Sequence, residues 1–246
     1  MTFPPGGHLP EKHADPKGNK ILQSGRLLAI GDIHGCVRPL DALLETLRLQ
    51  PTDLLVVLGD VVNRGPASCQ VIERLIKLQS ETGVILILGN HEEEMLASRV
   101  DRIALQRFLA MGGEAALASY GSSAGLNDIP ATHWQFLEAA LPWWECDEYF
   151  FTHANYAADL PLSQQKSAEL RWIGLADQPV RPHCSGKTAI VGHTPNLSGH
   201  VVDYGFLRCL DTGCGIGGYL TVMDVRSRQI WQCAEASDVV IWGALT

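Results

Sequence analysis

The sequence lacks the features that mark several large classes of protein. Its seven cysteines are widely spaced and form no CxxC pair, so neither a zinc knuckle nor a disulfide framework is indicated. No run of 18 apolar residues occurs, and the start, MTFPPGGHLPEKH, has no apolar signal core. We therefore expect free thiols, a cytoplasmic location and no membrane partner.

Positive charge is also scarce. The chain has 19 Lys and Arg against 27 Asp and Glu, which gives a formal net charge of −8 at pH 7. A nucleic-acid partner would need a basic face, so none is expected. A phosphorylated substrate is still compatible with this charge, because metal ions or one arginine can reverse the local field.

The 246 residues favour one large domain after a short arm. Residues 1–25 are rich in Pro, Gly, Lys and His without any hydrophobic period, which predicts a flexible N-terminal arm. No linker divides residues 26–246, which we expect to form a single domain. Its last residues include an apolar stretch, 239–242, that is interpreted as a final strand or an interface segment and leaves the oligomeric state open.

The hydrophobic pattern predicts two sheets. Apolar runs at 26–30, 54–58 and 84–88 alternate with helical patterns, as in βαβ units with buried parallel strands. Further helices are expected over 91–110, 113–119 and 131–140. Later strands are predicted at 149–152, 188–191, 200–203, 207–211, 219–225 and 228–233. These suggest a second sheet packed on the first, with helices outside: an α/β sandwich.

Five of the strand-like runs end in polar groups of the same kind. In chain order the groups are Asp32 and His34, then Asp60 with Asn63 and Arg64, then Asn90 with His91, then His153, and then His193. Ligands of α/β folds bind beyond the carboxyl ends of the strands, so we expect these side chains to meet. Oxygen and imidazole donors without thiolate suit manganese, iron or zinc better than calcium.

The number of donors suits two ions. Asp32 and His34 are two residues apart, so in extended chain they leave the backbone on the same side, and Asp60 could bridge the ions. Arg64 could hold phosphate oxygens through two parallel hydrogen bonds. His91 directly follows a candidate ligand and is expected at the rim of the site, where it could protonate a leaving oxygen.

The motifs GDIHG, GDVVNRG, GNHE, a strand-end histidine and GHT, in this order, resemble those of the calcineurin-like metallophosphoesterases of the phosphoprotein phosphatase family. The likeness covers roughly residues 26–233 and is closest to the small bacterial serine/threonine protein phosphatases. It implies a four-layer α/β/β/α sandwich and a centre of two divalent metal ions, manganese first and iron or zinc as alternatives.

The resemblance also implies a role for each residue. Asp32 and His34 would bind the first metal, Asp60 would bridge, and Asn90, His153 and His193 would bind the second metal. Arg64 would be the phosphate clamp and His91 the general acid. The attacking group would be a metal-bound hydroxide, with no phosphoenzyme.

Two departures from the family pattern concern the substrate. Asn63 stands where the protein phosphatases usually carry an Asp that stabilises the charged form of the general-acid histidine, so we expect a lower pKa for His91. Bacterial relatives often carry a second phosphate-binding Arg where this chain has Gly174. Arg171, predicted to lie on a strand or extended loop, is the candidate substitute.

Three functions follow from these patterns. The first is a two-metal phosphomonoesterase acting on phosphoserine or phosphothreonine of a phosphoprotein, or on small phosphomonoesters. The second is a dinucleoside polyphosphate hydrolase of the diadenosine tetraphosphate type, which Asn63 favours because a nucleotide phosphate is a good leaving group that needs less protonation. The third is an inactive phosphate-binding protein.

Overall fold

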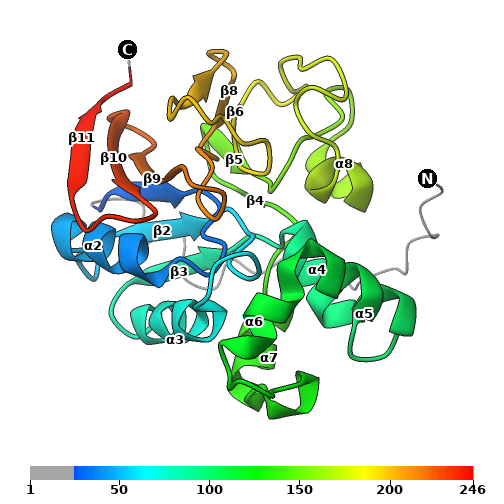
Figure 1. Ribbon diagram of the computed structural model, residues 1–246. Coiled ribbons are helices and arrows are strands. Elements are labelled where there is room, and N and C mark those ends of the chain that lie inside the picture. The colour runs from blue at the N-terminus through cyan, green and yellow to red at the C-terminus, as the bar shows by residue number, and fades with distance from the viewer. Residues whose placement is uncertain (1–24, 246) are drawn as a thin grey trace.

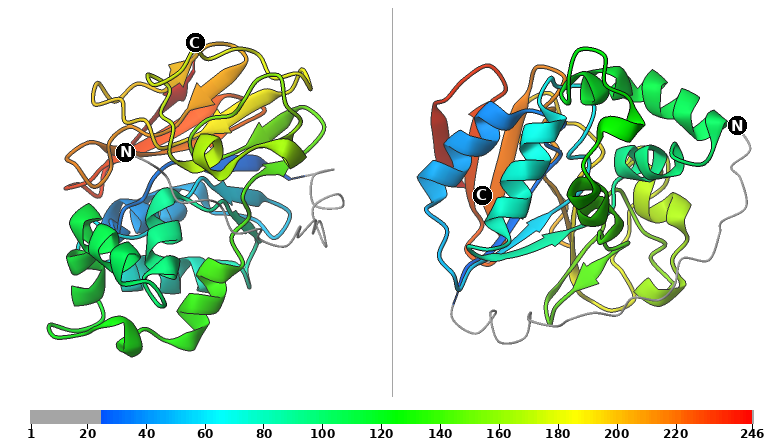
Figure 2. Two further views of the ribbon diagram at one scale, coloured as in Figure 1. Left: turned by 90° about the vertical axis from the view of Figure 1, so that its right-hand side faces the viewer. Right: turned by 90° about the horizontal axis from the view of Figure 1, so that it is seen from below.

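The computed structural model describes residues 25–245, so the arm predicted over residues 1–25 lies, apart from Gly25, outside the described part. Two sheets lie face to face at the centre, with helices outside (Figures 1 and 2). Each of the seven cysteines is free, as expected. Within residues 25–245, no helix combines the length and the apolar character needed to cross a membrane.

The first sheet has the strand order β11-β10-β9-β1-β2-β3. Its parallel strands are β1 (Leu27–Ile30), β2 (Leu54–Val57) and β3 (Gly83–Leu86). Next to β1, each strand is antiparallel to its neighbour: β9 (Tyr219–Asp224), β10 (Gln229–Ala234) and β11 (Val240–Ala244). Helices α2 (Val37–Leu47) and α3 (Ser68–Leu78) lie over its outer face, blue and cyan in Figure 2. Leu28 and Ile30 face these helices, because strand side chains alternate between faces.

The second sheet has the order β4-β5-β6-β8-β7. It consists of β4 (Trp144–Glu145), β5 (Tyr149–Phe151), β6 (Thr188–Val191), β7 (Val202–Asp203) and β8 (Leu207–Cys209). The prediction that the strands near 219–225 and 228–233 belong to this sheet is wrong. Ala29 of β1 pairs with Met223 of β9, so these strands complete the first sheet along the edge of β1.

Three hydrophobic layers hold the sandwich together. Leu27 and Ala29 of β1 pack against Phe151 and Ile190 between the two sheets. The opposite face of the second sheet is covered by residues 154–186, which include a 3-10 turn (Leu162–Gln164) and the short helix α8 (Ser167–Arg171). The predicted α/β/β/α layering is therefore confirmed, with an outer layer over the second sheet that is mostly irregular.

A helical segment extends from the end of β3. It contains α4 (Asn90–Ala97), α5 (Arg102–Phe108), a π-helical turn (Leu109–Gly113), α6 (Glu114–Ala118), a 3-10 turn (Leu126–Asp128) and α7 (Ala131–Glu138). The single helix expected over 91–110 is divided, because Asp101 starts a new one: its carboxylate accepts a hydrogen bond from the backbone N–H of Ile103. The segment lies beside the carboxyl end of the first sheet (Figure 1).

Candidate metal centre

The polar groups that follow the strands come together at one place. Asp32 and His34 follow β1, Asp60 follows β2, Asn90 and His91 begin α4 after β3, His153 follows β5, and His193 follows β6. Both sheets therefore contribute side chains to this place. All these side chains except that of His193 are buried, and His193 is half-buried.

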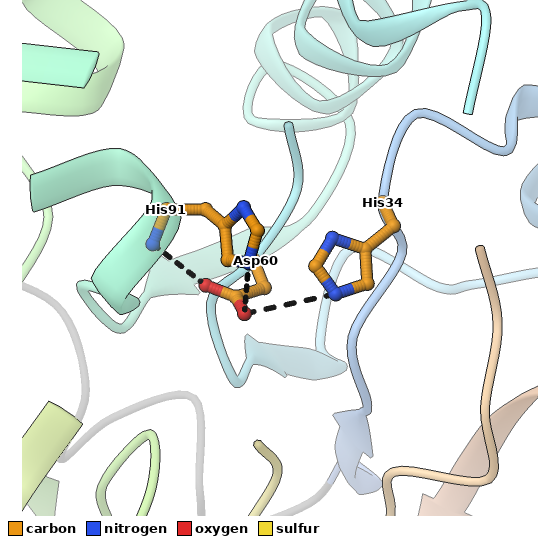
Figure 3. Close-up of side chains that lie close together, drawn as sticks. All are labelled: His34, Asp60 and His91. Atoms are coloured by element: carbon orange, nitrogen blue, oxygen red, sulfur yellow. Dashed lines mark hydrogen bonds and ion pairs between the residues drawn. The ribbon is translucent and has the colours of Figure 1, made fainter. Parts of the chain in front are cut away.

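The carboxylate of Asp60 lies at the middle of this group. Its Oδ2 lies 3.7 Å from Nε2 of His34, 3.8 Å from Nε2 of His91 and 3.4 Å from Nε2 of His153. Its Oδ1 accepts a hydrogen bond of 3.1 Å from the backbone N–H of His91. Figure 3 shows the rings of His34 and His91 next to one another, both turned towards the Asp60 carboxylate.

Two sets of donors share Asp60. One consists of His34, Asp60 and His91, the other of Asp60, His153 and His193, and within each set the ligand atoms lie within 4.8 Å of one another. Asn90 joins the second set, because its Oδ1 lies 3.0 Å from Nε2 of His153 and 3.2 Å from Nδ1 of His193. A residue common to both sets is in the position that a bridging ligand needs.

Three imidazoles of this centre each bond through one ring nitrogen to a backbone carbonyl oxygen. The bonds join Nδ1 of His34 to Val62 (3.1 Å), Nδ1 of His153 to Leu58 (2.7 Å) and Nε2 of His193 to Trp172 (3.2 Å). A carbonyl accepts only from N–H, so in the neutral rings the other nitrogen turns its lone pair to the centre. His34 Nε2 is buried without a hydrogen-bond partner, as befits a metal ligand.

The protonation states of His34 and His193 agree with this. Burial lowers the pKa of His34 to about 3 and that of His193 to about 4, so both rings are neutral at pH 7. Burial acts to raise the pKa of Asp60, but the neighbouring imidazoles, His153 first, hold it well below its usual range. Burial acts to lower the pKa of His153, but the charge of Asp60 raises it to about 10, so this point attracts positive charge. Carboxylate, imidazole and amide oxygen donors fit divalent ions.

Asp32 lies beside the first set of donors rather than within it. Its Oδ2 is 4.0 Å from Nε2 of His34. Both of its oxygens accept from the backbone N–H of His193, at 3.1 and 3.2 Å. Asp32 therefore ties the loop after β6 to the loop after β1 and keeps its carboxylate next to His34.

His91 is buried rather than at the rim, because it lies in the first turn of α4 and Asp60 holds its backbone. Its Nδ1 lies 2.9 Å from Nδ2 of Asn63, so its side-chain partner is an uncharged amide. Burial lowers the pKa of His91, the direction expected from the sequence. Arg64 is exposed beside this pair, and its backbone N–H bonds to the carbonyl of Gly112 at 3.4 Å.

Arg171 is not on a strand or loop but is the last residue of α8. It is buried, and its Nη2 lies 2.5 Å from Oε1 of Glu93 on α4. Nε1 of the next residue, Trp172, donates to Oε2 of Glu93 at 2.6 Å. The guanidinium is thus paired inside the protein. It supports Trp172, whose backbone carbonyl bonds to His193.

Glu92 is a residue that the sequence analysis missed. Its carboxylate is fully buried and accepts four backbone N–H groups. Oε2 accepts from Asp60 at 2.7 Å and Gly89 at 3.2 Å, and Oε1 from Val61 at 2.9 Å and Val62 at 3.2 Å. It therefore fixes the turn that presents Asp60. A signal was available, since a Glu three residues after the residue that caps a helix, here Gly89, commonly reaches back to the cap.

Comparisons with known proteins agree with this geometry. The family model "Calcineurin-like phosphoesterase" matches residues 25–214. A symmetrical bis(5'-nucleosyl)-tetraphosphatase of Pseudomonas putida is 25% identical over 281 aligned positions, which cover 85% of this chain and 93% of the relative. A protein of the same name from Pseudomonas syringae pv. tomato is 43% identical over 70 residues, 28% of this chain and 23% of the relative.

A solved structure shares the fold. It is provisionally named a diadenosine tetraphosphatase, and it superposes with a TM-score of 0.64 at 23% identity over 86% of this chain and 94% of its own. At that identity the likeness concerns the fold alone.

Proposed function

Because this chain belongs to the calcineurin-like phosphoesterase family and is a metal-dependent hydrolase, we propose that it cleaves dinucleoside polyphosphates of the diadenosine tetraphosphate type. The observation that carries the proposal is the contact of Asn63 with His91. The amide of Asn63 carries no charge, so it does not stabilise the charged ring as a carboxylate would, and burial lowers the pKa of His91 as well. A serine alkoxide needs a proton from such a group to leave, whereas a nucleotide phosphate leaves without one.

The names of the curated relatives support the same choice. Two Pseudomonas proteins matched by this chain are called symmetrical tetraphosphatases. This supports the dinucleotide more than the phosphomonoester first expected from the sequence. The 281 aligned positions hold only 85% of this 246-residue chain, so the relatives carry insertions that it lacks.

The two metal ions would share Asp60 and would leave His91 unbound, so that His91 can act on the leaving group. We assign His34, with Asp32 beside it, to one ion, and Asn90, His153 and His193 to the other. Bound divalent ions neutralise the charge that develops on phosphoryl oxygens and lower the pKa of water, and manganese is our first choice over iron or zinc.

The remaining roles belong to the side chains around the centre. Arg64 is exposed and free to orient a phosphate with its planar guanidinium. His91 presents Nε2 toward the centre, 3.8 Å from Oδ2 of Asp60, where it would pass a proton to the leaving oxygen. Arg171 pairs with Glu93, so we assign the phosphate contact to Arg64 and a supporting contact to Arg171.

A direct comparison of substrates tests the proposal. kcat/KM would be measured on diadenosine tetraphosphate and on a phosphothreonine peptide, with Mn²⁺ and again after chelation. We expect a preference for the dinucleotide that chelation abolishes. A preference for the peptide would overturn the proposal in favour of a protein phosphatase, and no turnover of either substrate with excess Mn²⁺ would indicate a phosphate-binding protein.

A further inference from the structure

Two exposed apolar side chains meet beside the candidate metal centre. Leu197 is 65% exposed on the loop after β6, and Ile216 is 47% exposed on the loop between β8 and β9. Both flank Gly213: a Cβ placed on this glycine would lie 2.6 Å from Cδ2 of Leu197 and 3.7 Å from Cγ1 of Ile216. We call Leu197 and Ile216 together the apolar shelf.

One side of the apolar shelf adjoins the first donor set. A Cβ on Gly215 would lie 2.5 Å from Cβ of His34, so the turn that carries Ile216 packs directly on this histidine. Leu197 follows His193 by four residues on the loop that leaves β6. Because Nε2 of His34 lies 3.7 Å from Oδ2 of Asp60, His34 alone stands between the turn that carries Ile216 and the shared carboxylate.

Hydrogen bonds hold the loop of Ile216 in place. The backbone N–H groups of Ile216 and Gly218 donate to the carbonyl of Gly213 at 3.2 and 2.8 Å. The carboxylate of Glu235 accepts from the N–H groups of Gly215 and Gly217 at 3.1 and 2.7 Å. Ile216 is thus presented to solvent by a fixed turn, so binding against it requires little ordering of the loop.

The second loop is fixed in a similar way. The backbone N–H of Asn196 donates to the carbonyl of Asp211 at 3.0 Å. The side-chain amide of Asn196 is also used within its own loop, since Nδ2 donates to the carbonyl of His200 and Oδ1 accepts from Ser198. The side-chain amide of Asn196, which precedes Leu197, is therefore already paired.

We propose that the apolar shelf receives the flat face of a nucleobase of the substrate, an inference that rests on the proposed function. A base joined through its ribose to the phosphate chain held at the centre would cover the exposed parts of Leu197 and Ile216. The side chains of Leu197 and Ile216 have no hydrogen-bonding atoms. The apolar shelf therefore favours a nucleotide over a bare phosphate but does not discriminate between different bases.

The test compares substrates with and without a base. In Leu197→Ser/Ile216→Ser, kcat/KM for diadenosine tetraphosphate relative to inorganic tripolyphosphate should fall roughly tenfold, as expected for losing part of the burial of two aliphatic side chains. Wild-type kcat/KM for the diguanosine analogue should lie within a few-fold of that for the adenosine compound. Val100→Ser/Ile103→Ser, on an exposed apolar pair at the start of α5, is the matched control and should leave the ratio unchanged.

Binding of ADP separates this inference from the proposed function. By calorimetry with Mn²⁺, the double variant should bind ADP roughly tenfold more weakly and pyrophosphate as tightly as the wild type. Unchanged ADP binding and an unchanged substrate ratio would overturn the role of the apolar shelf, even if the wild type cleaves dinucleotides. If the double variant instead lost kcat/KM only on a phosphothreonine peptide with apolar residues beside the phosphothreonine, the apolar shelf would bind peptides rather than a base. Failure of the wild type to cleave dinucleotides would overturn the proposed function alone if ADP binding still responds.

Discussion

Replacing Glu92 by Gln should loosen the metal centre without touching a ligand. The carboxylate accepts two N–H groups at each oxygen, those of Asp60 and Gly89 at Oε2 and those of Val61 and Val62 at Oε1. A glutamine has one oxygen, so its NH₂ group must face one of these pairs. Two buried donors then lose their acceptor, and the turn that holds Asp60 is the part that moves.

The size of the effect follows from these contacts. An unsatisfied buried donor costs about 1–3 kcal/mol, so two of them should lower the free energy of unfolding by roughly 3 kcal/mol. For a domain of this size that corresponds to a fall in Tm of about 6–12 °C. Changes to residues that orient metal ligands typically weaken metal binding by about 10–100-fold, which is our expectation for Mn²⁺.

Thermal unfolding and calorimetric titration with Mn²⁺ would measure both quantities. Glu81→Gln is the matched control, because Glu81 is exposed and Glu92 is fully buried. If Glu92→Gln kept the Tm within about 2 °C and the Mn²⁺ affinity within twofold of the wild type, the reasoning would be refuted. Glu92 would then contribute nothing to the position of Asp60.

Three further predictions concern the centre and the stability of the fold. Asp60→Asn should nearly abolish turnover and weaken Mn²⁺ binding, and full activity at full metal occupancy would contradict a shared ligand. Asn63→Asp should raise the pKa of His91 and increase kcat on phosphomonoesters more than on dinucleotides; an equal change on both would remove the leaving-group explanation. Burial acts to raise the pKa of Asp53, but hydrogen bonds from Arg26 and neighbouring backbone lower it. The ionised carboxylate therefore stabilises the fold above about pH 4, and this stabilisation is lost as the pH falls further. In chemical denaturation, Asp53→Asn should be less stable than the wild type at pH 7, and the difference should disappear in acid.

Much of the fold could be predicted because its signals are local. The apolar runs that form β1, β2 and β3 are each followed by a glycine and a polar residue. This pattern predicts the strands, and it also places Asp32, Asp60 and Asn90 just beyond their carboxyl ends. The family resemblance rests on the same residues, and the match of residues 25–214 confirms it.

The errors arose where the outcome depends on distant contacts. Whether β9 joins one sheet or the other is decided by the edge of β1, which nothing within residues 219–225 indicates. The burial of His91 depends on the backbone bond to Asp60, and the pairing of Arg171 depends on Glu93. The two-residue strand β4 is too short to have a pattern of its own.

The position of β1 inside the first sheet has a consequence for synthesis on the ribosome. β1 begins at Leu27 and its neighbour β9 at Tyr219, so the strand that leads into Asp32 and His34 has one open edge for most of translation. At about 5–20 residues per second, that interval lasts on the order of 10–40 s. A nascent chain stalled at residue 214 would contain every proposed metal ligand but would lack β9, the strand that pairs with the open edge of β1.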